Sequence, residues 1–339
     1  MEKVKVEDAV GMVLAHDLTK IVPGSFKGAA FKKGHVIRAE DIEELKNIGK
    51  DHIFIVPLTA DDIQENDAAY RVAKTAACGG LAVLEPLEGK ANIQATIAGV
   101  LRVNCEALNE INQSGDIALV TLHDHSMVAK DQIVAAAKVI PLVMTKRSVE
   151  QAETVCLCHR PLLEVKPLAP LKTGIIVSGS EVYYGRIQDR FGEVLKEKIH
   201  HYGGMFFDLQ YAPDDSDFLY QQIMRMVEQG AEMVLISGGM AVDADDVTPA
   251  AIRRAATEVV TYGVPVLPGS MCMVAYHQEI PIIGIPACAM FNKTTIFDLI
   301  LPRLLTKEKI QRNELLALAH GGLCLQCEEC HYPNCSFGK

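Results

Sequence analysis

The sequence predicts an α/β protein with a three-layer domain, in which helices cover both faces of a mostly parallel sheet, preceded by smaller α+β regions. The chain of 339 residues is longer than one typical domain, so two or three domains are expected. From residue 172 onward, short apolar runs alternate with segments whose apolar residues recur at helical spacing, which is typical of a parallel sheet. Polar loops follow several of these runs, and ligands bind at that edge of such sheets.

Composition and turn signals divide the chain into four expected segments. They are a β-rich segment at 1–57, an α+β region at 58–168, the three-layer domain at 169–308 and a cysteine-rich tail at 309–339. Before the three-layer domain we expect helices at 38–45 and 60–77, strands at 52–56 and 117–122, and a helix or a strand at 132–137. Three prolines predict a linker over 161–173.

The elements of the three-layer domain follow from apolar periodicity and from the signals that stop helices. Strands are expected at 173–177, 205–209, 233–236 and 281–285, with an extended segment at 264–269. Helices are expected at 187–199, at 214–229, from 249 onward and at 292–305.

The loop after the third of these strands is the most informative segment. It begins with Ser237-Gly238-Gly239 and ends with Thr248-Pro249, where Thr248 is a good N-cap and Pro249 suits the first helical position. Two glycines allow the backbone to approach a ligand, and a helix N-terminus offers free N–H groups to phosphate. A strand, a glycine loop and a helix start in this order predict an anion or nucleotide site.

Three carboxylates lie in the same loop, at Asp243, Asp245 and Asp246. Acids before a helix can simply suit its dipole, but three beside a glycine pair exceed what capping needs. They would repel a bare phosphate, whereas a divalent cation removes the conflict because Mg²⁺ prefers hard oxygen ligands. Asp246, the acid nearest to the helix, is our first choice for holding Mg²⁺ or for taking part in group transfer.

Three other loops that follow strands or extended segments carry candidate ligand groups. They are Ser178-Gly179-Ser180-Glu181, Pro268-Gly269-Ser270 and Pro286-Ala287-Cys288-Ala289. The carboxylate of Glu181 could help to hold a cation, or it is a solvated loop acid. Backbone N–H groups in the second loop could form a nest for phosphate, although an ordinary turn explains that loop equally well.

The C-terminal tail contains the pattern Cys324-x2-Cys327-x2-Cys330-x4-Cys335, with His331 inside it. Four cysteines so close together in an acidic chain are more plausible as metal ligands than as disulfides. The spacing is near that of iron–sulfur runs, with a longer last gap, and a Zn²⁺ site with four Cys or three Cys and one His also fits. Free thiols on a flexible tail are the alternative.

The remaining cysteines and histidines are weaker candidates. Four lone cysteines in apolar contexts are expected to be small buried hydrophobes: Cys78, Cys105, Cys272 and Cys288. The run Cys156-x-Cys158-His159 joins the tail site only if the fold brings the two together. The pair in His123-Asp124-His125 could coordinate a metal, but a lone His-x-His is usually structural.

Charge and hydropathy exclude several classes of partner. Lys and Arg number 33 against 43 for Asp and Glu, which gives a net charge of −10. Nucleic acid and anionic membranes both bind preferentially to basic protein surfaces, so neither is expected as the main partner of this acidic chain. No apolar run reaches the roughly 18 residues of a membrane span, and the first residues lack an apolar signal region. We therefore expect a cytoplasmic protein.

Taken together, these motifs resemble the MoaB/Mog molybdopterin-binding fold, which molybdopterin adenylyltransferases, molybdopterin molybdenumtransferases and gephyrin domains share. The motifs cover about residues 172–305 and are Ser178-Gly179-Ser180-Glu181, Gly185-Arg186-Ile187-Gln188-Asp189, Gly238-Gly239 with Asp246, Pro268-Gly269 and Gly284-Ile285-Pro286. Each is weak alone, but their order and spacing are specific. The first 57 residues also resemble a segment that precedes this domain in molybdenumtransferases.

The resemblance implies a transferase of molybdenum cofactor assembly, which inserts molybdate into molybdopterin or its adenylate with Mg²⁺ and releases AMP. The implied ligand-binding residues are Ser178, Gly179, Gly238, Gly239, Pro268, Gly269, Ser270 and Pro286. The implied catalytic residues are Asp246, Asp243, Asp245 and Glu181. A homodimer is also implied.

Departures from the transferase pattern leave the reaction open. Ala287-Cys288-Ala289 replaces the usual Gly-Asn-Pro, Ala241-Val242-Asp243 replaces Ser-Val-Gly, and the cysteine tail stands where molybdenumtransferases have a small β domain. Asp246-Val247-Thr248-Pro249 is closer to the version in adenylyltransferases, which act on ATP and molybdopterin. A third alternative is a non-catalytic carrier that holds finished cofactor for a client molybdoenzyme and uses the tail for docking or sensing.

Overall fold

The computed structural model describes residues 2–22, 26–56, 58–241 and 246–339. The chain divides into two compact units, Met1–Pro167 and Leu168–Lys339, which we call unit 1 and unit 2. Within the described ranges, no helix is both long enough and apolar enough to cross a membrane.

The first part of unit 1 is a small β-rich region with one α-helix. Its elements are β1 (Glu2–Lys5), the 3-10 turn η1 (Val6–Asp8), β2 (Val13–Leu14), β3 (Leu18–Val22), β4 (Phe26–Phe31), α1 (Asp41–Asn47) and β5 (His52–Val56). β5 is the middle strand of a sheet with the order β1-β5-β2, and β3 pairs with β4. Leu14, Leu45 and Ile55 are fully buried in the core of this region.

The rest of unit 1 combines antiparallel sheets with three helices. Its strands are β6 (Asp62–Gln64), β7 (Leu81–Val83), β8 (Lys90–Ala95), β9 (Gly99–Val103), β10 (Ile117–Thr121), β11 (Met127–Val128), β12 (Ile133–Val139), β13 (Val143–Thr145) and β14 (Leu163–Lys166). Its helices are α2 (Glu65–Ala76), α3 (Cys105–Asn112) and α4 (Lys146–Cys158). The sheet orders are β10-β12-β8-β7, β11-β9-β14 and β13-β6. Helix α2 packs on α4 and on strands β8 and β12, which encloses a single apolar core.

Unit 2 is built on a six-stranded sheet with the order β16-β15-β17-β20-β19-β18. Its strands are β15 (Lys172–Ser178), β16 (Met205–Ala212), β17 (Met233–Ser237), β18 (Glu258–Tyr262), β19 (Met273–His277) and β20 (Ile280–Ile285). Its helices are α5 (Ser180–Tyr183), α6 (Phe191–His201), α7 (Ser216–Glu228), α8 (Thr248–Ala255), the 3-10 turn η2 (Ala287–Met290), α9 (Ile296–Leu305) and α10 (Arg312–Ala317). β16, β15, β17 and β20 are parallel, whereas β19 is antiparallel to both of its neighbours.

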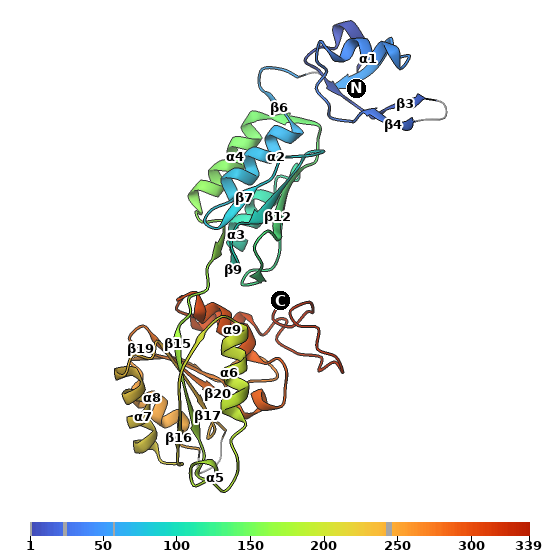
Figure 1. Ribbon diagram of the computed structural model, residues 1–339. Coiled ribbons are helices and arrows are strands. Elements are labelled where there is room, and N and C mark those ends of the chain that lie inside the picture. The colour runs from blue at the N-terminus through green and yellow to red at the C-terminus, as the bar shows by residue number, and fades with distance from the viewer. Residues whose placement is uncertain (1, 23–25, 57, 242–245) are drawn as a thin grey trace. The chain divides into compact units, whose positions relative to one another are not determined.

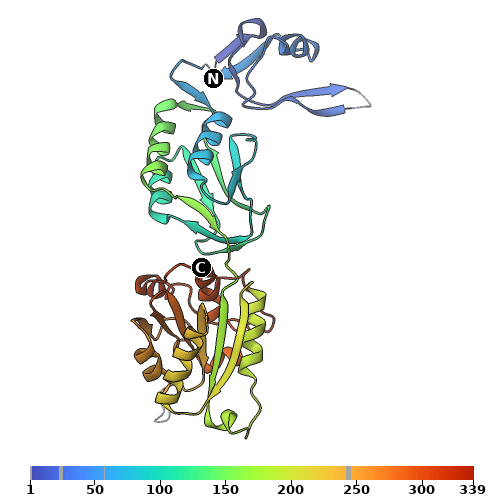
Figure 2. The same ribbon diagram turned by 60° about the vertical axis from the view of Figure 1, so that its left-hand side comes forward.

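Alternate residues of the central strands enter two separate cores, because successive side chains of a strand point to opposite faces. Ile175 and Leu235 pack with α6 and α9 on one face of the sheet. Ile176 and Val234 pack with α7 and α8 on the other face. Figure 1 shows these helices on both sides of the sheet, and the turned view in Figure 2 agrees. The three-layer α/β architecture that the sequence predicts for this part of the chain is therefore confirmed.

In unit 1, tertiary pairing accounts for the differences from the predicted elements. The helix predicted at 60–77 begins at Glu65, because Asp62–Gln64 forms β6 and pairs with β13. The segment at 132–137, which suited a helix or a strand, lies in strand β12. The linker predicted over 161–173 includes a strand, because β14 pairs with β9, and the two units divide after Pro167.

In unit 2, the predicted strands are present, and the differences lie at helix starts and at the antiparallel edge. Helix α9 begins at Ile296 rather than at 292, because Thr295 and Asp298 form a capping box. Thr248, the predicted N-cap, is the first residue of α8, and Val247 is at the N-cap. Strands β18 and β19 flank the predicted extended segment and were not expected.

Candidate functional site

The carboxyl ends of β15 and β17 meet where the strand order of unit 2 reverses. The chain passes from β15 outward to β16 on one side and then returns to β17 on the other side. In open α/β sheets, ligands bind in the crevice at such a switch point. Gly238, directly after β17, has φ of +88°, and a Cβ on it would lie 1.9 Å from the carbonyl oxygen of Ser178 at the end of β15. Only glycine fits this contact, so Gly238 sets the separation of the two strand ends.

Three of the predicted loops line one cavity of about 580 Å³ in unit 2. The predicted site residues among its lining are Gly238, Gly239, Asp246, Pro268, Gly269, Ser270 and Pro286. These residues come from the loop after β17, the segment between β18 and β19, and the loop after β20. The structure therefore brings together residues that are separated by up to three strands in the sequence.

Asp246 lies beside Tyr262, a residue of β18 that the sequence did not single out. The phenol of Tyr262 donates to the carbonyl oxygens of Met240 (3.0 Å) and Ala241 (3.1 Å), which holds the loop after β17. Burial raises the pKa of Tyr262, and the negative charge of Asp246 raises it further. Tyr262 therefore stays a neutral donor, and Asp246 provides the negative charge in the cavity wall.

The predicted residues of the first loop are placed differently from the others. Ser178 reaches the site through its backbone carbonyl against Gly238, and its hydroxyl is buried. The carboxylate of Glu181 folds back over Gly179, where a Cβ would lie 2.8 Å from its Oε1 atom. Neither Gly179 nor Glu181 is among the described residues that line the cavity. Their roles in ligand binding and catalysis stay predictions.

The two other predicted acids and the predicted helix start contribute no described side chain to the lining of the cavity. Asp243 and Asp245 lie outside the described residues. Thr248 is fully buried, and its hydroxyl donates to the carbonyl oxygen of Gly238 at 2.8 Å. Its side chain therefore fastens the loop to α8 instead of capping that helix. The described lining of the cavity includes neither Thr248 nor Pro249.

Two buried hydroxyls at the strand ends lack a hydrogen-bond partner within the described part of the chain. They are the Oγ atoms of Ser178, which is 4% exposed, and of Ser237, which is fully buried. Buried polar groups are normally satisfied, so an unpaired hydroxyl needs an explanation. Both lie at the carboxyl ends of β15 and β17, which is the edge where a ligand or an ordered water would supply the partner.

The turn at Pro268-Gly269 is fixed by helix α9. The N–H of Ile296, the first residue of α9, donates to the carbonyl oxygen of Pro268 at 3.2 Å. A Cβ on Gly269 would lie 2.4 Å from the Cγ2 atom of Ile296. The glycine is therefore explained by helix packing, and the turn is a rigid part of the cavity wall.

The C-terminal tail forms a wall of the same cavity, an arrangement that no sequence motif indicated. Leu323, Cys324 and Gln326 line it together with the loops. The N–H of Cys324 donates to the carbonyl oxygen of Leu267 at 2.8 Å, next to the Pro268 turn. This pairing is between residues distant in the sequence, so no local pattern could have indicated it.

No group of three or more His, Cys, Asp or Glu side chains is positioned to hold a metal ion within the described ranges. Asp246 is the predicted Mg²⁺ ligand that the structure places in the cavity. Mg²⁺ often takes one or two carboxylates and completes its shell with water and substrate phosphate, so the cavity fits that ion when a phosphorylated ligand is present.

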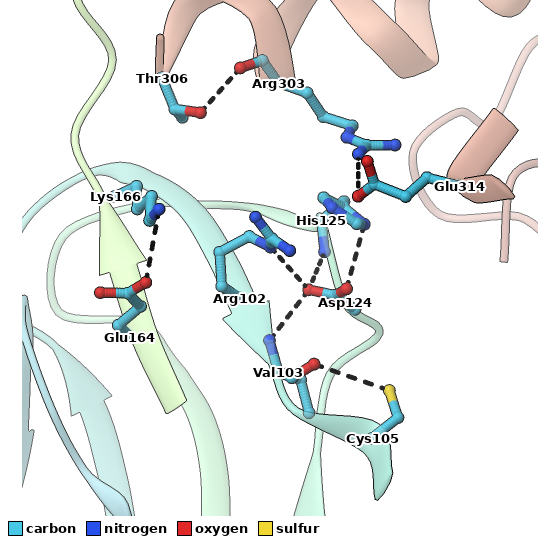
Figure 3. A network of polar contacts seen from close by, with 10 residues as sticks. All are labelled: Arg102, Val103, Cys105, Asp124, His125, Glu164, Lys166, Arg303, Thr306 and Glu314. Atoms are coloured by element: carbon cyan, nitrogen blue, oxygen red, sulfur yellow. Dashed lines mark hydrogen bonds and ion pairs between the residues drawn. The ribbon is translucent and has the colours of Figure 1, made fainter. Parts of the chain in front are cut away.

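The other candidate metal ligands lie in unit 1, where the Nδ1 atom of His125 is 3.2 Å from the carboxylate of Asp124. Figure 3 shows the carboxylate of Asp124 accepting from Arg102 Nε (3.2 Å) and from the backbone N–H groups of Val103 and His125 (2.9 Å each), so this acid holds a turn. Cys156 is fully buried in the core, where burial raises the pKa of its thiol to about 11. Cys158 is exposed on the same helix.

The four lone cysteines are free thiols with different degrees of burial. Cys272 is fully buried, and burial raises the pKa of its thiol to about 12. Cys78 and Cys288 are half-buried, and Cys288 lines the ligand cavity. Cys105 is exposed, so the expectation that it is a buried hydrophobe is wrong; it is the first residue of α3.

Two family models match parts of the chain. Residues 174–306 match a model described as a probable molybdopterin binding domain, and residues 3–57 match one described as a domain of unknown function. The CinA-like protein of Mycobacterium tuberculosis is 31% identical over 83 residues, which are 24% of this chain and 19% of that protein. For the CinA-like protein of Mycobacterium leprae, the identity is 30% over 83 residues with the same coverage, 24% and 19%. The chain thus spans about a fifth of the length of these curated relatives.

Solved structures of proteins described as molybdopterin or molybdenum cofactor biosynthesis proteins also match. The molybdopterin biosynthesis enzyme MoaB from Thermus thermophilus matches with 17% identity and a TM-score of 0.36, over 41% of this chain and 98% of that one. A molybdenum cofactor biosynthesis protein from Pyrococcus furiosus matches with 15% identity and a TM-score of 0.28, over 90% of this chain and 63% of that one. The family match leads to one conclusion: residues 174–306 form a domain of the MoaB/Mog type, described as probable molybdopterin binding.

Proposed function

We propose that unit 2 binds molybdopterin or its adenylate in the cavity at the strand ends and inserts molybdate into it during molybdenum cofactor assembly. The observation that carries this proposal is the convergence of three predicted loops on one cavity of about 580 Å³. Small-molecule sites usually have roughly 300–1,000 Å³, so a pterin with its phosphate is of suitable size. The family match over the same residues supports a pterin as the ligand.

Asp246 has the central role in the proposed reaction. Its carboxylate lies in the cavity wall and would hold Mg²⁺ together with the phosphate of the ligand. The bound cation would neutralise that phosphate and polarise its bond to the departing AMP. Asp243, Asp245 and Glu181 are proposed to assist. The glycine loop and the rigid Pro268 turn would position the pterin, so that its dithiolene sulfurs meet molybdate.

Release of AMP tests this function directly. Purified protein is incubated with molybdopterin adenylate, molybdate and Mg²⁺, and AMP is quantified. Asp246→Asn keeps the side chain's size and removes its charge, so we expect a loss on the order of 10²-fold or more. Asp217→Asn is the control, because Asp217 is exposed on α7 and is not in the described lining of the cavity. Equal release by the two variants would exclude the role of Asp246.

The tail favours a second candidate, a non-catalytic carrier that holds finished cofactor for a client molybdoenzyme. Leu323, Cys324 and Gln326 add a wall to the cavity, and the loop after Pro286 forms the short turn η2 in place of Gly-Asn-Pro. Tight pterin binding without AMP release would identify a carrier. Formation of the adenylate from ATP and molybdopterin would instead identify an adenylyltransferase. The homodimer and the client enzyme stay predictions, and light scattering of the purified protein tests the first of them.

A further inference from the structure

Four cysteines of the C-terminal tail line one cavity of unit 2, next to the ligand cavity. Cys324, Cys327, Cys330 and Cys335 surround a space of about 280 Å³ together with the segment 291–294. We propose that this cavity is the site of an iron–sulfur cluster bound by the four cysteine thiolates. The site goes beyond the proposed pterin chemistry, and its existence does not depend on it.

The tail is packed on unit 2 and not detached from it. Phe337 is only 3% exposed and lies in the core that contains α9. The N–H of Gly338 donates to the carbonyl oxygen of Gly321 at 2.9 Å, which closes the tail on itself. The phenol of Tyr332 donates to the carbonyl oxygen of Asp298 at 3.2 Å. These contacts hold the tail against the rest of unit 2.

The arrangement of the four thiols around one cavity is compatible with a cluster. In a structural zinc site the four ligands converge on one ion, with Zn–S distances of about 2.3 Å. Within the described residues, which include the whole tail, no three such side chains are grouped to hold one ion. All four cysteines nevertheless line the same cavity, and so does His331, so metal analysis must distinguish a cluster from zinc. In a polynuclear cluster the cysteines bind different irons, so the thiols stand around it instead of meeting at one point.

The spacing of the cysteines agrees with this assignment. The first three form the run Cys324-x2-Cys327-x2-Cys330, which has the spacing of bacterial iron–sulfur runs. In those runs the fourth cysteine follows after three residues and binds a different cluster. Here it follows after four residues, and Cys335 lines the same cavity as the other three. One cavity with four cysteines provides the complete set of ligands for one cluster.

The surroundings of the sulfur atoms suit the negative charge of cluster thiolates. The backbone N–H of Gln326 donates to the Sγ atom of Cys324 at 3.5 Å. The hydroxyl of Thr294 lies 3.3 Å from the Sγ atom of Cys330. Lys293 and Glu328 both line the same cavity, so its lining carries one basic and one acidic side chain. Hydrogen bonds to sulfur and nearby charge are the features that tune iron–sulfur clusters.

The experiment uses the full chain, purified without oxygen and reconstituted with Fe²⁺ and sulfide under a thiol reductant. We expect about four irons and four sulfides per chain, with a broad visible band that dithionite bleaches. Cys327→Ser should lose most of the iron and the band, and because Cys327 is exposed the fold should persist, which circular dichroism checks. Cys158→Ser, an exposed cysteine of unit 1, should keep both.

Several results would overturn the proposal. They are one zinc per chain with no iron, absence of iron after reconstitution, and equal iron in the Cys327→Ser and Cys158→Ser variants. Since iron, sulfide and the visible spectrum are measured without pterin, failure of the cluster proposal is distinguishable from failure of the proposed pterin chemistry.

Discussion

Gly238→Ala tests whether the close contact between the ends of β15 and β17 builds the ligand cavity. The backbone of Gly238 has φ of +88°, and a Cβ there would lie 1.9 Å from the carbonyl oxygen of Ser178. Real Cβ atoms essentially never approach closer than 3.0 Å, so the two strand ends must separate by about 1.1 Å. The displacement falls on the loop that carries Asp246 into the cavity.

The expected cost has two parts. A left-handed backbone costs a residue with a Cβ about 1–2 kcal/mol, and overpacking against a neighbouring backbone adds about 1–3 kcal/mol. The free energy of unfolding of unit 2 should therefore fall by about 2–5 kcal/mol. For a domain of this size, each kcal/mol lowers the midpoint of thermal unfolding by about 2–4 °C. Pterin affinity should also fall, because a misplacement of about 1 Å can cost on the order of 10²-fold at a site.

Gly230→Ala is the matched control for backbone strain. Gly230 follows α7 with φ of +99°, and no described heavy atom lies within 4 Å of the position of its Cβ. This variant carries only the backbone cost of about 1–2 kcal/mol and should bind pterin as the wild type does. Circular dichroism melts and titration with molybdopterin measure both effects. If the two variants melt alike and bind alike, the contact with Ser178 contributes nothing and the reasoning is wrong.

Three further predictions concern single side chains. Thr248→Val removes the donor to the Gly238 carbonyl (2.8 Å), so urea unfolding of unit 2 should show a loss of about 1–3 kcal/mol, and an unchanged curve would contradict this. Burial raises the pKa of Glu65 above 4.5, so the folded state binds more protons and stability falls as the pH rises through that range. Glu65→Gln should therefore stabilise unit 1 at about pH 7 and lose this advantage at about pH 4, whereas equal effects at both pH values would refute it. Burial raises the pKa of Cys272 to about 12, so iodoacetamide should modify exposed Cys158 and spare Cys272, which peptide mass spectrometry of the native protein checks.

The central strands of unit 2 could be predicted because their signals are local. Val234, Leu235 and Ile236 form a continuous apolar run, and both faces of β17 are indeed buried. The glycine pair and Asp246 directly follow that run, so the carboxyl edge of the sheet was the natural place for the site. Position along the chain was sufficient to identify three loops that meet at one cavity, whereas Gly179 and Glu181 of the fourth predicted loop are not in its described lining.

The parts that could not be predicted depend on contacts between distant segments. Thr248 has the residue type of an N-cap, but its hydroxyl bonds to Gly238, a contact made only after the loop has closed. Tyr262 lies on β18, a strand that was not expected, and its phenol holds the same loop through two carbonyl groups. The placement of the tail depends on the burial of Phe337 and on backbone hydrogen bonds to Leu267. Such contacts between distant segments produce no periodic pattern in the sequence.

The wall between the two cavities of unit 2 connects the proposed cluster with the proposed pterin site. Cys324 and Gln326 line both cavities, whereas Cys327 lines only the cysteine cavity of the two. A cluster bound to Cys324 would fix this wall, since the N–H of Gln326 already donates to that sulfur atom. By thermodynamic linkage, if the bound cluster changes the affinity for pterin by some factor, bound pterin changes the affinity for the cluster by the same factor. Pterin affinity of the cluster-loaded chain and of Cys327→Ser should therefore differ, although residue 327 does not touch the pterin cavity, and equal affinities would mean that the two cavities act independently.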